Sequence, residues 1–208
     1  SWGDVLNALE AQDPFINKTT FKIVSNFYGL NEKFKPGRYV LKSGLNNLTL
    51  VRKIARGWQD PIRLTINNIT LREQLAGRVA KKLDIDSSAL ANVMYDDSIA
   101  NTFGFNGENF AAMFIANTYE IYWDTDISGF LERMNTEYKR FWNDERKAKV
   151  VATGLTEQEN IILASIVQKE TNSKQEYGTI ASTYKNRLRI GMPLQADPTV
   201  KFALKNFA

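Results

Sequence analysis

The chain has 208 residues, of which 43% are hydrophobic and 24% are charged. This length and composition suffice for a sizeable core in one or two domains, and they exclude wholesale disorder. The net charge of +4 has no long basic run behind it, so we expect no nucleic-acid partner.

The sequence contains neither histidine nor cysteine. The lack of histidine excludes Ser-His-Asp and Cys-His catalysis and every His-ligated metal site, so we expect no metal. Acid–base chemistry must therefore fall to carboxylates, lysine or tyrosine. The apolar run at residues 161–167 is too short to cross a bilayer.

The N-terminal part, residues 1–64, is expected to form a small α+β unit. Its expected elements are helices over 3–11, 18–28 (with Thr19 or Thr20 near its start) and 48–56, and strands over 38–41 and 61–66. The turn signal Lys35-Pro36-Gly37 precedes the first strand, and Gly57 is expected to end the last helix.

Residues 65–208 are expected to be mainly helical with short strands. Thr70 and Glu73 have capping-box spacing at the start of a helix with an apolar stripe. The further expected elements are a short helix over 86–95, a loop over a short helix at 99–110, an extended segment at 117–123 and one long helix over 126–149.

The segment after residue 155 is the most informative. Thr156 and Glu159 form a second capping box, and a helix then runs through IILASIVQKET, residues 161–171, and is expected to end around residues 171–173. Helical spacing of i, i+3, i+4 and i+7 defines an apolar stripe of Leu163, Ile166, Val167 and Glu170. A carboxylate therefore occupies a stripe position where a leucine is expected.

Two physical effects are expected to raise the pKa of Glu170. Burial disfavours the charged carboxylate, and the last helical turn faces the negative end of the helix dipole. A glutamate that is protonated near neutral pH has the property that a general acid needs. The alternative is a structural glutamate, paired with a lysine or arginine elsewhere or placed at the solvent edge.

A further helix is expected over about residues 175–190, because its apolar positions repeat with helical spacing and Gly191 and Pro193 would end it. Its apolar face consists of Tyr177, Ile180, Ala181, Tyr184 and Leu188, with Arg187 at the edge and Asn186 pointing away. Asp197 before Pro198 is typical of a helix N-cap followed by a first-turn proline, which is one explanation of Asp197. Capping does not explain Gln195, a polar residue in the loop before it.

The run ASIVQKETNSKQEYGTIASTYKNRLRIGMPLQADPTVKFAL, residues 164–204, resembles the core of the endolytic murein transglycosylases, the YceG-like family. That family has a similar A-S-I-x-x-K-E-T, an N-R-L helix and G-M-x-L-Q-x-D-P-T. The segment 117–119 also resembles the family, with Ala116 in place of the usual proline, and Gln168 stands where the family often has glutamate.

The resemblance implies an α+β fold with a LysM-like domain at residues 1–64, its first strand missing, and a YceG-like catalytic domain at 65–208, its C-terminal part missing. It implies a lyase that cleaves the MurNAc–GlcNAc β-1,4 bond of nascent glycan strands and leaves 1,6-anhydro ends. Glu170 would act as both acid and base, without a cofactor. No second acid stands beside Glu170 in the motif, and Asp197 is the nearest candidate for the second carboxylate that ordinary hydrolases need.

The resemblance also implies roles for other residues. Gln195, Asp197 and Thr199 would position the substrate, and Asn186 and Arg187 would bind the sugar or brace the site. Tyr119 would stack on a pyranose ring, or it packs in the core. The implied partners are peptidoglycan strands and peptidoglycan synthases (penicillin-binding proteins), in the bacterial cell envelope. An N-terminal anchor in the inner membrane, absent from this chain, would leave this part facing the periplasm or the outside.

Two alternative functions remain at this point. One is a non-catalytic peptidoglycan-binding module of the cell-wall synthesis machinery, against which the retained Glu170 argues. The other is a pyridoxal-phosphate lyase, which needs a phosphate cradle that the sequence does not display.

Overall fold

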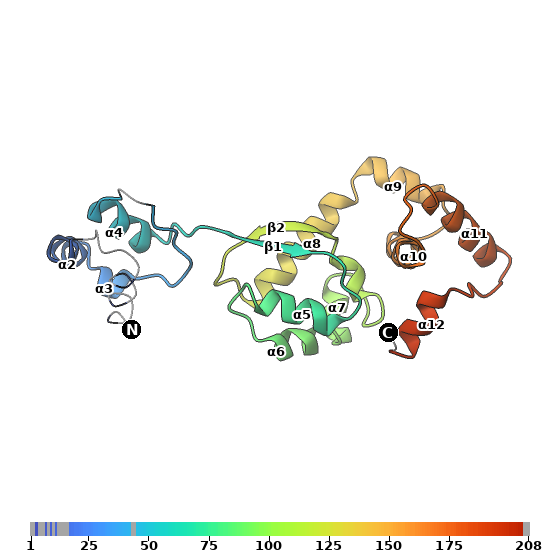
Figure 1. The fold of residues 1–208 in the computed structure, drawn as a ribbon, viewed down its shortest axis with the longest axis horizontal. Coiled ribbons are helices and arrows are strands. Elements are labelled where there is room, and N and C mark those ends of the chain that lie inside the picture. Colours follow the sequence, from blue (N-terminus) through green and yellow to red (C-terminus); the bar gives the residue numbers. More distant parts are fainter. Residues whose placement is uncertain are drawn as a thin grey trace. The chain divides into compact units, whose positions relative to one another are not determined.

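The computed structural model describes residues 17–42 and 45–205, together with residues 3, 7, 9 and 11. The chain divides into two compact units, Ser1–Asp96 with Ala116–Arg133 and Asp97–Ile115 with Met134–Ala208. These bounds differ from those of the two expected domains, 1–64 and 65–208, and that division stays a prediction. The expected α+β class is confirmed, because helices dominate and the described residues hold one antiparallel pair of strands (Figure 1).

Three helices share a small hydrophobic core in the N-terminal part of the first unit. They are α2 Lys18–Phe27, α3 Leu30–Lys33 and α4 Asn47–Arg56, and their buried residues are Phe21, Leu30, Leu50, Val51 and Ile54. Asparagine side chains cap α2 and α4, since Asn17 accepts from the Thr20 amide at 3.1 Å and Asn46 accepts from the Thr49 amide at 2.8 Å. The helices expected here are confirmed, except that the one over 3–11 lies mostly outside the described residues.

The strand expected over residues 38–41 is wrong, because this segment is irregular. Its backbone groups form hydrogen bonds with Asp60 and Lys53 instead of with a neighbouring strand. The Val40 amide donates to the Asp60 carboxylate at 2.7 Å, and the Asp60 amide donates to the Arg38 carbonyl at 2.9 Å. The Lys53 ammonium then donates to the Val40 carbonyl at 3.1 Å.

The two strands are β1 Ile62–Ile66 and β2 Asn117–Ile121, paired antiparallel with Leu64 opposite Tyr119 (Figure 1). Leu64 and Ile66 are buried while Arg63 and Thr65 are exposed, so the alternation expected for β1 is confirmed. Two helices, α5 Arg72–Ala80 and α6 Ser87–Val93, pack against each other in the same unit.

The capping box expected from Thr70 and Glu73 is wrong. Helix α5 begins one residue later than expected, and the Gln74 side chain accepts from the amides of Thr70 and Leu71 at 3.0 and 3.2 Å. Glu73 instead accepts from the Tyr95 hydroxyl at 2.8 Å. Gln74 therefore takes the capping role expected of Glu73, one residue later in the sequence.

The long helix expected over residues 126–149 is two helices, α8 Ile127–Phe141 and α9 Asp144–Val151. The side chain of Asn143 accepts from the Arg146 amide at 3.0 Å and so starts α9. The remaining short elements are α7 Asp97–Thr102 and the 3₁₀ helix η1 Phe110–Met113, at the loop expected over 99–110.

Candidate functional site

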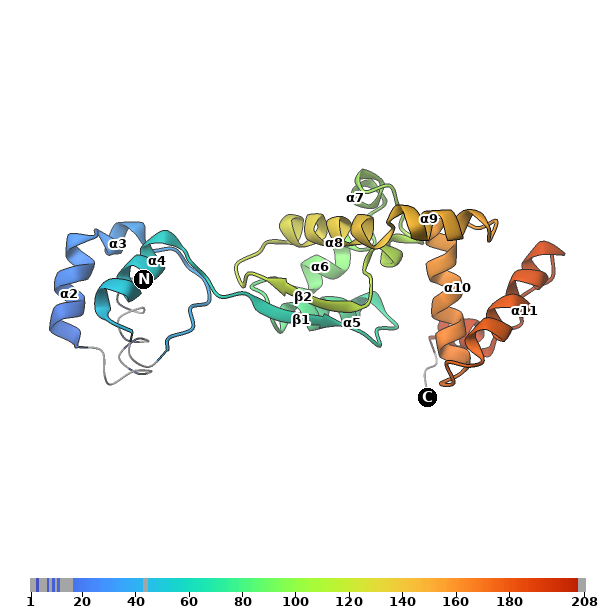
Figure 2. The same cartoon turned by 90° about the horizontal axis from the view of Figure 1, so that it is seen from above.

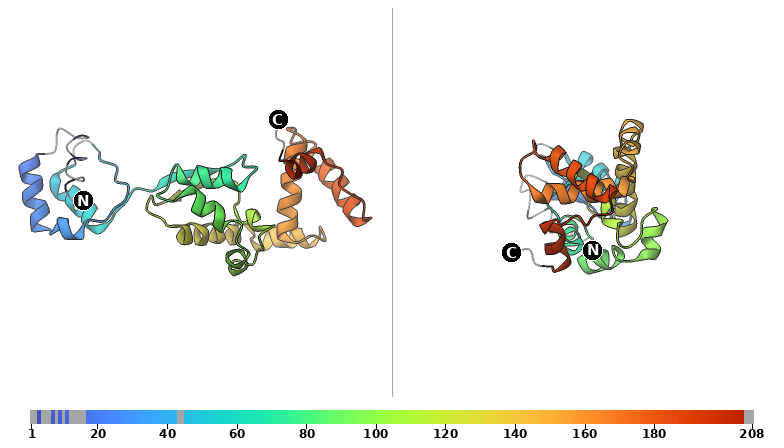
Figure 3. Two further views of the ribbon diagram at one scale, coloured as in Figure 1. Left: turned by 90° about the horizontal axis from the view of Figure 1, so that it is seen from below. Right: turned by 90° about the vertical axis from the view of Figure 1, so that its right-hand side faces the viewer.

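Three helices of the second unit carry most of the residues to which the sequence assigns a function. They are α10 Glu157–Glu170, α11 Tyr177–Arg189 and α12 Asp197–Ala203. Helix α11 turns back along α10, and α12 contacts α10 near its C-terminal end (Figures 2 and 3). The buried residues Leu163, Val167, Tyr184 and Ala196 form the core between these segments.

The capping box that starts α10 is confirmed. The Glu159 amide donates to the Thr156 hydroxyl at 3.2 Å, and the Thr156 amide donates to the Glu159 carboxylate at 2.7 Å. This bond from the Thr156 backbone, with a second from its side chain, lowers the pKa of Glu159. The sequence therefore fixes where α10 begins, and with it the position of Glu170 thirteen residues further on.

Glu170 is exposed, so the expectation that α10 buries it is wrong. The apolar stripe itself is present, since Leu163 and Val167 are buried and Ile166 is half-buried. Glu170 is the last residue of α10, and the backbone becomes extended at Thr171. The core that covers the stripe therefore ends before it reaches this carboxylate, and the desolvation expected from the helical pattern is absent.

Tyr184 connects Glu170 to the rest of the candidate site. Its ring is buried, and burial is the largest cause that raises the pKa of Tyr184. The next causes are the charge of Glu170 and the hydrogen bond between its carboxylate and the Tyr184 hydroxyl. The charge of Arg187 opposes this rise and that of Asp197 adds to it, so charged residues of α10, α11 and α12 all influence the pKa of this one hydroxyl group.

The sequence placed Tyr184 only on the apolar face of a helix. The missed signal is chemical, because a tyrosine on a buried face still carries a hydroxyl that needs a polar partner. That requirement points to a polar residue nearby, but the sequence does not say which one.

Arg187 joins α11 to the loop before α12. Its guanidinium donates to the Leu194 carbonyl, and it lies 6.0 Å from the centre of the Tyr184 ring. The Met192 amide donates to the Arg187 carbonyl at 2.8 Å, and Gly191 has a left-handed backbone with φ of 68°. Arg187 is half-buried, whereas Asn186 is exposed. Arg187 therefore holds the loop in place.

The expectation that Asp197 caps α12 is wrong by one residue. Ala196 is the N-cap, Asp197 is the first helical residue and no side chain caps this helix. The Thr199 hydroxyl donates to the Ala196 carbonyl at 2.7 Å, which gives Thr199 a local structural role. The exposed Asp197 side chain has no such role, so the capping explanation no longer accounts for it.

Gln195 is exposed and has a left-handed backbone with φ of 49°. This conformation costs a residue other than glycine about 1 kcal/mol, and such strain is often found at functional sites. The strained backbone and the exposed polar side chain at this position have no structural explanation in the described part of the chain.

If Gln195 contacts a substrate, Gln195→Gly is expected to lower the rate of the reaction about tenfold while the free energy of unfolding changes by less than about 1 kcal/mol. Glycine fits the left-handed backbone, so only the side chain is lost. Gln195→Ala should lose the same activity. Steady-state kinetics and urea denaturation measure both quantities, and Lys205→Gly, which relaxes a residue with φ of 51° elsewhere, is the control. Full activity in Gln195→Gly would refute a substrate contact.

The sequence profile of the YceG-like family matches residues 1–208. The chain belongs to the YceG-like family. The family expected from residues 164–204 is thereby confirmed.

Among curated proteins, the chain is similar to the endolytic murein transglycosylase of Bacillus subtilis (strain 168), with 23% identity over 219 residues. The match covers 96% of this chain and 59% of the relative, so the chain spans about three fifths of that protein's length. Among solved structures, it is similar to a yceG-like protein of Listeria monocytogenes, with a TM-score of 0.52 and 21% identity. That match covers 99% of this chain and 72% of the other, and it supports the fold alone.

Tyr119 lies in the first unit, away in sequence from the other candidate residues. It is 3% exposed within β2, which favours core packing over stacking on a sugar.

The two residues that depart from the family pattern, Gln168 and Ala116, are both exposed. Within the described residues, no group of three or more acidic side chains could hold a metal ion, and no helix is long and apolar enough to span a membrane.

Proposed function

We propose that this protein is a lytic transglycosylase that cleaves the MurNAc–GlcNAc β-1,4 bond within peptidoglycan strands and leaves 1,6-anhydro ends. The observation that carries this proposal is the position of Glu170 at the end of α10, beside the buried Tyr184 of α11, which packs in one core with the segment just before α12. Membership of the YceG-like family and the name of the Bacillus subtilis relative support the same activity.

Glu170 is the acid and the base of the proposed reaction. Its carboxyl group gives a proton to the glycosidic oxygen as the bond from that oxygen to C1 of MurNAc breaks. The C6 hydroxyl oxygen of the same sugar then bonds to C1, and Glu170 takes the C6 hydroxyl proton. The carboxyl group ends in its starting state and no water is consumed. Glu170 is exposed in the free protein, so the bound glycan must exclude water from it.

Other residues position the carboxylate and the sugar. The Tyr184 hydroxyl orients the Glu170 carboxylate through its hydrogen bond. Arg187 holds the loop from which Gln195 reaches the glycan. Asp197 supplies a second polar contact, and Asn186 and Thr199 line the sugar from α11 and α12.

Hydrolysis with two carboxylates is the second candidate. Glu170 and Asp197 both raise the pKa of Tyr184, and Asp197 begins α12, which contacts α10. A pair of carboxylates is the arrangement that glycoside hydrolases use, with the second as a nucleophile or as the base that activates water. A hydrolase would leave reducing ends instead of anhydro ends.

Digestion of purified glycan strands in water enriched in oxygen-18 separates the two reactions. We expect the new MurNAc ends to have the anhydro mass and to contain no oxygen-18, because no water enters the product. A hydrolytic muramidase run in parallel must give reducing ends with one labelled oxygen. Labelled reducing ends from this protein would contradict the lyase mechanism and support hydrolysis.

The proposed setting follows from this substrate. Peptidoglycan strands lie in the cell envelope, so the enzyme would act there and near the synthases that make nascent strands. Anchoring in the inner membrane through a segment preceding this chain belongs to the same proposal.

A further inference from the structure

The N-terminal helices carry a disproportionate share of the positive charge. Between residues 17 and 58 the sequence has nine lysines and arginines and one acidic residue, a formal charge of +8. The whole chain carries +4, so the remaining residues together are net negative. An anionic ligand would therefore be attracted to this part of the chain.

Arginines and aromatic rings lie side by side on the surface of these helices. Phe27 is 87% exposed, and its ring lies 5.7 Å from that of Tyr28. The Arg52 Nε donates to the Tyr28 hydroxyl at 2.9 Å. One turn further along α4, the Arg56 guanidinium lies 4.8 Å from the centre of the Trp58 ring. We call these residues the arginine–aromatic strip: Phe27, Tyr28, Arg52, Arg56 and Trp58.

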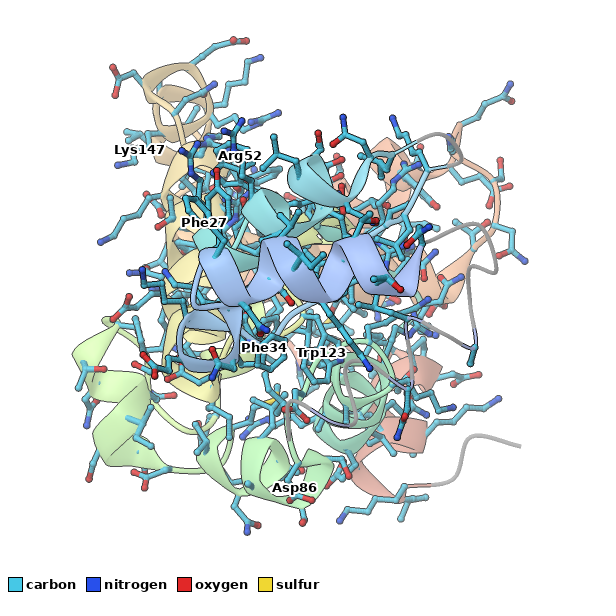
Figure 4. All side chains as sticks on the ribbon, turned by 90° about the vertical axis from the view of Figure 1, so that its left-hand side faces the viewer. Phe27, Phe34, Arg52, Asp86, Trp123 and Lys147 are labelled. Carbon is cyan, nitrogen blue, oxygen red and sulfur yellow. The ribbon has the colours of Figure 1, made fainter. Side chains whose placement is uncertain are left out.

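Figure 4 labels Phe27 at the end of α2 and Arg52 on α4. The ring contact and the hydrogen bond connect Phe27 to Arg52 through Tyr28. Trp58 is 54% exposed, and Ile23, one turn before Phe27, is 63% exposed. The strip therefore combines charge with a large exposed apolar area.

We propose that the arginine–aromatic strip docks this protein on an anionic phospholipid surface. A soluble polyanion would neutralise the arginines but offers no apolar phase to Phe27 and Ile23. A neutral polysaccharide would stack on the rings but does not match the charge of +8. A bilayer surface with anionic headgroups provides phosphates for the guanidinium groups and an interface in which aromatic rings are favourable.

The strip is also arranged in advance of binding. The Arg52 and Arg56 side chains are held against rings at 5.8 and 4.8 Å, so docking orders few further rotamers. Lys53 is not part of the strip, because its ammonium lies 2.5 Å from the Asp60 carboxylate. The proposal depends on the two arginines and the rings beside them.

Co-sedimentation of the purified protein with phosphatidylcholine vesicles, with and without about 30% phosphatidylglycerol, tests the proposal. We expect binding only to the anionic vesicles, and its loss when salt rises from about 50 to about 500 mM. The double variant Arg52→Gln/Arg56→Gln should partition about thirtyfold more weakly. Phe27→Ala, which leaves the charge unchanged, should partition about tenfold more weakly.

The matched control is Lys81→Gln/Lys82→Gln, which removes the same charge from two exposed lysines of the first unit. Its partitioning should stay within about twofold of the unchanged protein. Absence of binding to anionic vesicles would overturn the proposal, and so would an equal loss in the lysine control. Binding to soluble polyphosphate or to purified peptidoglycan that Phe27→Ala leaves intact, without vesicle binding, would assign the strip to another ligand. Circular dichroism of each variant confirms that it is folded.

Discussion

Glu170→Gln is expected to lower the rate of anhydro-end formation about a thousandfold. The amide keeps the size of the carboxyl group but can neither give a proton to the glycosidic oxygen nor take one from the C6 hydroxyl. Analysis of purified glycan strands by mass spectrometry measures the new ends. Glu176→Gln is the matched control, because Glu176 accepts from the Thr171 hydroxyl at 2.6 Å and glutamine can accept the same bond.

A second measurement on Glu170→Gln does not depend on activity. The charge of Glu170 raises the pKa of Tyr184, so the substitution should lower that pKa. NMR titration of tyrosine ring carbons detects the change, and Tyr184→Phe assigns the signal. Anhydro ends formed equally by Glu170→Gln would make the mechanism wrong. Glycan binding without new ends from either protein would favour a non-catalytic glycan-binding module. An unchanged titration of Tyr184 would show that Glu170 does not affect this hydroxyl group. The activity test of Glu170 would still be valid.

Several helices and their starts were predictable from the sequence because their determinants are local. The capping box of Thr156 and Glu159 involves residues three apart, and both of its hydrogen bonds are present. The period of the apolar residues likewise placed Leu163 and Val167 in the core. Such signals depend on neighbours within one or two helical turns, which a sequence displays directly.

Elements that depend on distant partners were not predictable in this way. Residues 38–41 have a strand-like composition, but the carboxylate of Asp60 takes the Val40 amide that a second strand would need. Glu73 has capping-box spacing, but the Tyr95 hydroxyl, 22 residues on, occupies it. Each of these hydrogen bonds joins residues far apart in the sequence, so no local sequence pattern predicts it.

The candidate site was likewise predictable in its local features and not in its long-range contacts. Periodicity gave the side of α10 on which Glu170 lies but not how far the covering core extends, and the core stops short of it. The influence of Glu170, Asp197 and Arg187 on the pKa of Tyr184 depends on how α11 and α12 pack against α10. The family resemblance predicted Glu170, Arg187 and Asp197 as site residues, whereas the involvement of Tyr184 is known only from the structure.

Arg187→Met is expected to lower the free energy of unfolding by about 2 kcal/mol and glycan turnover about a hundredfold. Methionine keeps the length of the side chain but loses the charge and the donor to the Leu194 carbonyl. The loop that carries Gln195 then loses its side-chain link to α11, and a shift of about 1 Å in a positioning group is enough for such a loss of rate. Urea denaturation and steady-state kinetics measure the two effects.

Arg189→Met is the matched control, since Arg189 is an exposed arginine two residues further along α11. Its free energy of unfolding should change by less than about 0.5 kcal/mol. The sequence left two roles open for Arg187, and the two measurements distinguish them. A brace loses stability without substrate present, and a sugar ligand raises KM while stability is unchanged. Because the guanidinium already bonds to the Leu194 carbonyl in the free protein, we expect the brace.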